Sequence, residues 1–164
     1  MVISCTTDIC EIKTKSSVLS LRLSKPTAEG GYIDINKVEL PGPGEYEVGE
    51  VFAEISARLA HFHIEDMVAV VYRQALGEVT SEDLAVLERV DVLLLLRKSE
   101  AKEDVQALLK LSTKVEPRVL ILTGVSDVDS ITKLEGQTPE VVASLKLVAK
   151  DLPEEGQRLY VLHR

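Results

Sequence analysis

The 164-residue sequence contains no Trp, and only 4% of its residues are aromatic. A hydrophobic core must therefore be built from Val, Leu, Ile and Ala, which favours buried strands and Leu-rich helices over aromatic ligand platforms. With 45% hydrophobic residues, a chain of this length can remove roughly 70% of its unfolded surface from water. We expect one folded domain over residues 1–164.

Long apolar runs and targeting signals are also missing. Apolar runs such as Val92 to Leu96 are far too short to cross a bilayer. At the N-terminus no basic segment precedes an apolar stretch, and Asp8 and Glu11 come too early for a secretory signal. We therefore expect a cytoplasmic protein with no membrane contact.

Basic charge is scarce in this sequence. The chain carries 27 acidic and 19 basic residues, a formal net charge of -8, and no Lys/Arg run interrupts the acidic balance. Such a field repels phosphate backbones, so we expect no nucleic-acid partner. Polyanionic substrates would be repelled as well, unless a local basic pocket or a bound cation overrode the net field.

Only two cysteines occur, Cys5 and Cys10. In a chain without a secretory signal we expect two free thiols rather than a disulfide. No second Cys pair or paired His follows at zinc-finger spacing, so the two cysteines alone would lack partners for a zinc site. Catalysis by a thiolate would need a neighbouring base, and the sequence supplies none for either residue.

The first half of the chain has the pattern of strands. Apolar and polar residues alternate with period two in 10–13 and in 18–23, which predicts a hairpin around a turn at 15–17. The apolar run Met67 to Tyr72 is more continuous. It predicts a central strand that is covered on both faces.

Interleaved proline and glycine follow the next strand pattern. Residues 33–40 repeat the alternation, with an irregularity at Asn36 and Lys37. Pro41 to Gly44 then interleaves two residues of restricted φ with two of permissive φ, which predicts a tight, fixed turn. Further strands are expected over 46–55.

From Thr80 the period changes to that of helices. Thr80 and the acids after it form an N-terminal helix signature, with apolar residues at helical spacing up to Val90. A second helix is expected over 100–111, between the buried strands Val92 to Leu96 and Val119 to Leu122. This alternation of strands and helices favours parallel pairing in a covered sheet.

Two short apolar segments close the chain. They cover residues 145–148 and 159–162. The turn-rich segment 151–156, with Pro153 and Gly156, joins them. We therefore expect the chain to end in a hairpin.

The stretch Gly42-Pro43-Gly44-Glu45-Tyr46-Glu47-Val48, followed by Val51 and Phe52, resembles a segment of the metallo-β-lactamase superfamily. The similarity is to the branch of ascorbate-phosphate-lactonase-like hydrolases, and the order of expected elements is similar from about Cys10 onward. The resemblance implies an α/β fold, a metallo-β-lactamase-like αββα sandwich with mixed β-sheets flanked by helices. It also implies a metal site at one edge.

The metal ligands that the resemblance implies for active members are missing. Their main His-x-His-x-Asp-His motif precedes the Gly-Pro-Gly stretch, whereas the first histidine here is His61. A bridging Asp would fall near Gln74-Ala75, and a final His would follow Leu122, where Thr123-Gly124 stands. The short connection 25–31 indicates that the unit carrying the main motif has been deleted.

One histidine pair remains a candidate for metal binding. Alternate residues of a strand share a face, so His61 and His63 could chelate one metal with Glu65 or Asp66 as a third ligand. This segment follows the Gly-Pro-Gly stretch, and its acid spacing differs from the implied motif. A solvated strand end or loop is the simpler interpretation, so we assign no catalytic, cofactor-binding or metal residue.

The sequence therefore predicts a truncated pseudoenzyme without metal or cofactor, which acts through protein contacts as a structural or regulatory module. Loss of a strand–helix unit would expose apolar surface and a sheet edge, so we expect a homodimer or another protein partner. Two alternatives stay open. One is a metal-dependent hydrolase rebuilt around His61, His63 and Asp66, and the other is a metal-free module that binds a small ligand in the old cleft.

Overall fold

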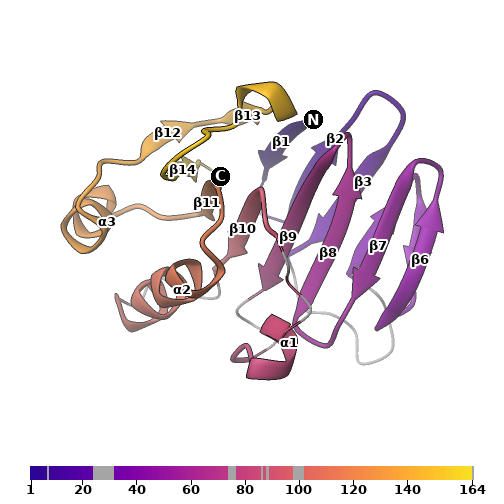
Figure 1. The fold of residues 1–164 in the computed structure, drawn as a ribbon, viewed down its shortest axis with the longest axis horizontal. Coiled ribbons are helices and arrows are strands. Elements are labelled where there is room, and N and C mark those ends of the chain that lie inside the picture. The colour runs from indigo at the N-terminus through magenta and orange to yellow at the C-terminus, as the bar shows by residue number, and fades with distance from the viewer. Residues whose placement is uncertain are drawn as a thin grey trace.

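The computed structural model describes residues 1–6, 8–23, 32–73, 77–85, 87, 89–97 and 102–163. Two features predicted from the sequence, the connection 25–31 and the position of a bridging acid at 74–75, lie outside the described residues. The described chain forms two β-sheets and three α-helices (Figure 1).

The first sheet has six strands, each antiparallel to its neighbours. In spatial order they are β13 (Ser144–Lys146), β1 (Val2–Cys5), β2 (Ile9–Lys13), β3 (Val18–Arg22), β4 (Ile33–Ile35) and β5 (Val38–Leu40). Buried and more exposed residues alternate along β2 and β3, because only one face of this sheet meets the core. The hairpin predicted around the turn at 15–17 is confirmed.

The second sheet has eight strands and is mixed. In spatial order they are β12 (Glu140–Val142), β14 (Arg158–Leu162), β11 (Val119–Thr123), β10 (Val92–Leu96), β9 (Met67–Arg73), β8 (Leu59–Ile64), β7 (Val51–Ile55) and β6 (Gly44–Val48). The strands from β12 to β9 pair in parallel, and those from β9 to β6 pair antiparallel.

A helical segment follows each of three parallel strands. These are α1 (Ser81–Ala85) after β9, α2 (Lys102–Val115) after β10 and α3 (Val128–Glu135) after β11. None of the helices in the described ranges is long and apolar enough to span a membrane. The predicted parallel pairing of β9, β10 and β11 is confirmed.

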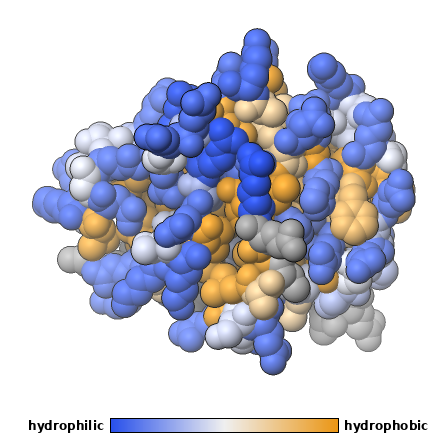
Figure 2. Space-filling model, viewed as in Figure 1, coloured by the Kyte–Doolittle hydropathy of each residue, from blue (hydrophilic) through white to orange (hydrophobic). Residues whose placement is uncertain are grey.

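Two apolar layers explain why these central strands are buried on both faces. One layer fills the space between the two sheets and includes Ile3, Leu19 and Phe62. The other lies between the eight-stranded sheet and the helices and includes Leu93 and Leu108. Figure 2 shows mostly hydrophilic side chains on the side facing the viewer in Figure 1, with hydrophobic ones visible between them.

The helices in the described ranges cover one side of the sandwich. Apolar side chains of α1, α2 and α3, such as Leu84, Leu108 and Ile131, pack on the outer face of the eight-stranded sheet. Within the part of the chain that the structure describes, no helix lies on the outer face of the six-stranded sheet. The implied αββα arrangement is therefore present on one side, and the six-stranded sheet is antiparallel rather than mixed.

The strand pattern over 33–40 is two strands rather than one irregular strand. Asn36 and Lys37 have φ angles of 52° and 68° and form a two-residue turn between β4 and β5. Asn tolerates positive φ at low cost, so the chain reverses here instead of bulging.

The turn at Pro41 to Gly44 connects edge strands of the two sheets. It leads from β5 in the six-stranded sheet to β6 in the eight-stranded sheet. Gly42 and Gly44 have φ angles of 153° and 154°, which glycine adopts at little cost. The Tyr46 hydroxyl donates to the Gly42 carbonyl oxygen at 2.9 Å and fixes the crossing.

The predicted closing hairpin is wrong. Strand β13 pairs with β1, whereas β14 pairs with β11 and β12 in the other sheet. The segment 151–156 therefore crosses between sheets. Helix α3 was not expected, although the sequence carries its signals: the Asp127 side chain accepts from the Ser130 N–H at 3.0 Å, and Gly136 ends the helix with φ 71°.

Candidate functional site

The parallel strands of the eight-stranded sheet end together at one edge. β9 ends at Arg73, β10 at Leu96 and β11 at Thr123, and the register aligns these ends. Ligands in sheets of this kind bind beyond the carboxyl ends of the strands. The resemblance places a carboxylate after β9 and a histidine after β11 at this edge, which we call the carboxyl edge.

Arg73 occupies the carboxyl edge with a buried cation. Arg73 is 3% exposed, and its Nη2 donates to the Leu23 carbonyl oxygen at 2.6 Å. The guanidinium carbon lies 5.6 Å from the centre of the Tyr32 ring, within reach of a cation–π interaction. Burial lowers the pKa of Arg73, but an arginine remains charged across the physiological range.

Tyr32 supplies an aromatic face rather than an ionised oxygen. Burial raises the pKa of its hydroxyl to about 12, and the Arg73 charge offsets only part of this effect. Among the described residues, no hydrogen-bond partner reaches the buried hydroxyl. Tyr32 therefore contributes packing and its ring quadrupole to the edge.

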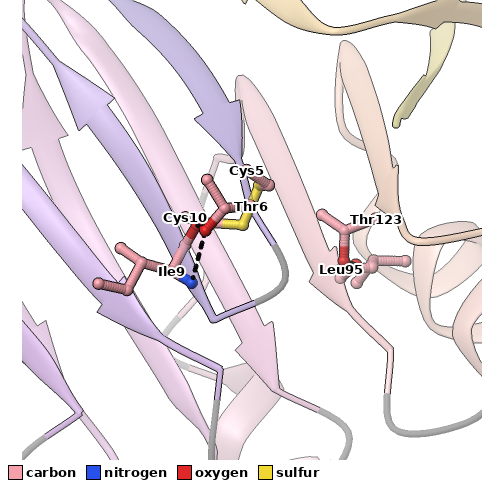
Figure 3. Close-up of a disulfide and its surroundings, with 6 residues drawn as sticks. All are labelled: Cys5, Thr6, Ile9, Cys10, Leu95 and Thr123. Carbon is pink, nitrogen blue, oxygen red and sulfur yellow. Dashed lines mark hydrogen bonds between the residues drawn. A yellow bond between two sulfur atoms is a disulfide. The ribbon is translucent and has the colours of Figure 1, made fainter. Parts of the chain in front are cut away.

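Cys5 and Cys10 form a disulfide at the turn between β1 and β2 (Figure 3). The two residues are directly opposite in the antiparallel register, with Cα atoms 4.0 Å apart. The prediction of two free thiols is therefore wrong. It was based on the expected cellular compartment, which carries no information on the strand register that sets the two cysteines opposite each other. Their support for a cytoplasmic location is removed, and neither sulfur is a free nucleophile.

Two hydrogen bonds of Leu23 connect the disulfide turn to the Arg73 side chain. The Leu23 N–H donates to the Asp8 carbonyl oxygen at 2.7 Å, and the Leu23 carbonyl oxygen accepts from Arg73. On β11, the buried Thr123 hydroxyl donates to the Leu95 carbonyl oxygen at 3.4 Å. Figure 3 draws Thr123 and Leu95 in the surroundings of the disulfide.

These side chains do not fit a zinc ion. Zinc in proteins is held by imidazole nitrogen, thiolate sulfur and carboxylate oxygen. Arg73, Tyr32, Thr123 and the disulfide offer none of these groups, and Arg73 brings a positive charge instead. In the described ranges, no group of three or more His, Cys, Asp or Glu residues could hold a metal ion.

The candidate histidines lie elsewhere, on the outer face of β8. His61 is opposite Val70 of β9, a residue of the layer beneath the helices, so its side chain points away from the other sheet. The His61 and His63 rings are 4.9 Å apart. The Glu54 carboxylate of β7 lies 3.9 Å from Nδ1 of His61.

The environment of His61 favours the neutral imidazole. Burial and the neighbouring His63 lower its pKa, and Glu54 opposes this shift. His63 is exposed, as expected for a solvated strand end, whereas His61 is half-buried within the strand. The structure therefore brings the predicted pair together and adds Glu54, which sequence spacing did not predict because it belongs to the neighbouring strand.

Asp66 belongs to the turn between β8 and β9. The φ angle is 62° at Asp66 and 48° at Glu65. The Glu65 carboxylate forms a salt bridge with the Met1 ammonium at 2.6 Å and accepts a hydrogen bond from the Lys15 N–H at 2.9 Å. Asp66 and His63 line one hollow of about 570 Å³ at this end, opposite to the carboxyl edge, but they do not complete a metal site with His61.

No protein-family model and no curated protein matches this sequence. Among solved structures, the fold is similar to that of a Thermotoga maritima protein assigned to the Zn-dependent hydrolases of the metallo-β-lactamase superfamily. The superposition has a TM-score of 0.72, covers 100% of both chains and has 16% sequence identity. The chain therefore has a metallo-β-lactamase-like fold, and at this identity the similarity shows the fold alone.

Proposed function

We propose that this chain is a metal-free, non-hydrolytic protein of the metallo-β-lactamase-like fold that acts through contacts with other proteins. The observation that carries the proposal is Arg73, a buried cation at the edge where the resemblance places metal ligands. A fixed positive charge repels a divalent cation in a buried site, where screening is weak. Fold similarity alone does not supply an activity.

Metal content tests this proposal directly. Protein purified without added metal is measured by elemental analysis, then titrated with Zn²⁺ in a calorimeter. We expect well under one metal ion per chain and no saturable zinc binding at the carboxyl edge. Stoichiometric zinc, iron or manganese in the wild type would overturn the proposal, and the metal content of His61→Ala/His63→Ala would then tell whether the histidine pair or another site holds the metal.

A hydrolase assay provides a second test of the proposed function. Lactone, phosphodiester and β-lactam substrates are incubated with the protein in the presence of Zn²⁺ or Mn²⁺. We expect rates equal to those of buffer with the same metal. Turnover that a chelator abolishes, and that scales with protein concentration, would contradict the non-hydrolytic assignment.

The histidine pair supports one other candidate, a metal-dependent hydrolase with a rebuilt site. Its supporting observation is the 4.9 Å separation of the His61 and His63 rings on one face, with Glu54 replacing Asp66 as the nearby carboxylate. Two imidazoles and one carboxylate form a common catalytic zinc set, but the described positions of these three groups do not form a metal site, so this candidate requires the side chains to move. Stoichiometric metal lost in His61→Ala/His63→Ala but retained in Asp66→Ala would favour this candidate.

A further inference from the structure

The disulfide between Cys5 and Cys10 closes a hydrogen-bonded turn at the surface. The Thr6 N–H donates to the Ile9 carbonyl oxygen at 2.8 Å, and the Ile9 N–H donates to Thr6 Oγ1 at 3.2 Å (Figure 3). Thr6 and Asp8 are exposed and Ile9 is 38% exposed, so solvent reaches the turn. These hydrogen bonds do not involve the sulfur atoms, so they can hold the two cysteines opposite each other when the disulfide is reduced.

Two thiols are compatible with the position of this disulfide. Cys10 is 0% exposed and Cys5 is 7% exposed, and both belong to the apolar layer between the sheets. A reduced cysteine behaves as a small apolar residue and is commonly buried. The two cysteines are only five residues apart, and a loop this short contributes little chain entropy when it opens. We therefore expect the dithiol form to remain folded.

Leu23 connects the loop 5–10 to the buried cation. The Leu23 N–H donates to the Asp8 carbonyl oxygen, which lies inside the loop closed by the disulfide. The Leu23 carbonyl oxygen accepts from Arg73 Nη2, and the Arg73 guanidinium lies over the Tyr32 ring. The position of Asp8 therefore influences the position of Leu23, and Leu23 provides one acceptor for Arg73.

We propose that the Cys5–Cys10 disulfide is a reversible redox switch that sets how firmly Arg73 is held at the carboxyl edge. In the disulfide form, the closed loop keeps Asp8 against Leu23, and the Leu23 carbonyl oxygen stays on Arg73. In the dithiol form the loop gains freedom, so the hydrogen bond between Leu23 and Asp8 opens more often and the contact with Arg73 weakens. The switch needs neither a metal ion nor a partner protein, so it is independent of the function proposed above.

Two molecules of a small thiol such as glutathione carry out the reduction. The thiolate of the first attacks the sulfur of Cys5, the more exposed of the two cysteines. The S–S bond breaks, and its electron pair passes to the Cys10 sulfur, which takes up a proton. The thiolate of the second molecule attacks the mixed disulfide, and Cys5 leaves as a thiolate that is protonated. The two thiols depart as one disulfide, so two electrons and two protons pass to the protein, and oxidised glutathione reverses each step.

Amide hydrogen exchange measured by NMR tests the switch in the folded protein, with reduced and then with oxidised glutathione. We expect the Leu23 amide to exchange about tenfold faster in the dithiol form and to recover on reoxidation. The Thr14 amide, which donates to the Ser17 carbonyl oxygen at the opposite end of β2, should not change. Cys5→Ser/Cys10→Ser should resemble the dithiol form in both buffers.

Asp91→Ala is the control for a general loss of stability, because it weakens the fold at the amino end and keeps the disulfide. We expect its Leu23 amide to exchange as slowly as in the wild type. Equal acceleration in Asp91→Ala and in the dithiol form overturns the proposal, since the disulfide would then act only through global stability. A disulfide that glutathione reduces only in denaturant, a dithiol form that unfolds, or a Leu23 amide that does not respond also overturns it.

Coupling between the disulfide and Arg73 must act in both directions, which gives a second test. Arg73→Met removes the contact with the Leu23 carbonyl oxygen. We expect it to shift the equilibrium in glutathione buffers toward the dithiol form by at least about fivefold. Arg158→Met, the same change at an exposed position of β14, should leave the equilibrium as in the wild type. No shift in Arg73→Met, or an equal shift in the control, would overturn the coupling to the carboxyl edge.

Discussion

The two ends of the parallel strands in the eight-stranded sheet use buried charge differently. At the amino end, Asp91 accepts from the Val68 N–H at 2.9 Å, from Arg89 at 3.1 Å and from Arg118 at 3.3 Å. At the carboxyl edge, Arg73 donates to a backbone carbonyl and packs against Tyr32.

From this difference we expect the stability of the fold to depend more on the buried charge at the amino end than on the buried charge at the carboxyl edge. Asp91 joins the starts of β9 and β10, and Arg118 extends the network to the Pro153 carbonyl oxygen at 2.7 Å. An anion surrounded by donors is expensive to remove, whereas we expect Arg73 to be replaceable by an apolar side chain of similar volume. The predictions that follow test this contrast.

The largest effect is expected at Asp91. Asp91→Ala removes the side-chain acceptor of the Val68 N–H and one of the acceptors of the Arg118 guanidinium, in a site where the Asp91 side chain is 4% exposed. We expect a loss of about 3 kcal/mol in the free energy of unfolding, measured by chemical denaturation. Glu155→Ala, at an exposed position, is the control. Equal losses in the two variants would remove the distinction between the ends.

Reduction of the disulfide should have the next largest effect. Cys5 and Cys10 are five residues apart, and for a loop this short the chain-entropy relation gives about 2 kcal/mol. The free energy of unfolding is measured with and without a thiol-free reductant. Cys5→Ala/Cys10→Ala should not respond to the reductant, and a response would show that it acts somewhere other than the disulfide.

Glu65 at the amino end should contribute a smaller, pH-dependent amount. The hydrogen bond from the Met1 ammonium, together with that from the Lys15 N–H, holds the pKa of Glu65 below its usual range. Its contribution is therefore complete above the unfolded pKa of about 4.3 and is lost as the pH falls through the folded pKa.

Glu65→Gln is the variant that measures this contribution. We expect a loss of about 1 kcal/mol at neutral pH, and a difference from the wild type that shrinks at strongly acidic pH. Denaturation curves at several pH values give the comparison. A difference that stays constant down to low pH would mean that the carboxylate charge is not responsible.

The smallest effect is expected at the carboxyl edge. Arg73→Met keeps most of the side-chain volume and removes the buried charge, so we expect stability within about 1 kcal/mol of the wild type. Arg73→Ala should lose at least about 2 kcal/mol, because it leaves a cavity. If Arg73→Met is as damaging as Asp91→Ala, the guanidinium charge is essential and the two ends are equivalent.

Local sequence patterns determined the central elements of the fold. The apolar runs at 67–72, 92–96 and 119–122 are β9, β10 and β11 because a continuously apolar strand must be covered on both faces. Period-two alternation similarly identified the hairpin of β2 and β3. Both patterns depend only on which faces of a strand are buried, and this information is local.

Tertiary structure alone decided the pairings between distant segments. Strands β13 and β14 have the pattern of a hairpin but join different sheets, because an apolar alternation does not specify a partner strand. Arg73, directly after a buried run, could have been noticed as a charge ending a core strand. Its contact with Leu23, which is 50 residues away in the chain, could not have been predicted from the local sequence.

The histidines and the residues at the carboxyl edge illustrate the same division. The sequence determined that no histidine precedes His61, since identity at a position needs no structure. Only the tertiary structure determined that the Arg73 guanidinium lies over the Tyr32 ring and that Cys5 and Cys10 form a disulfide. Side chains from different strands meet there because sheet register and layer packing bring them together, and neither is encoded by local periodicity.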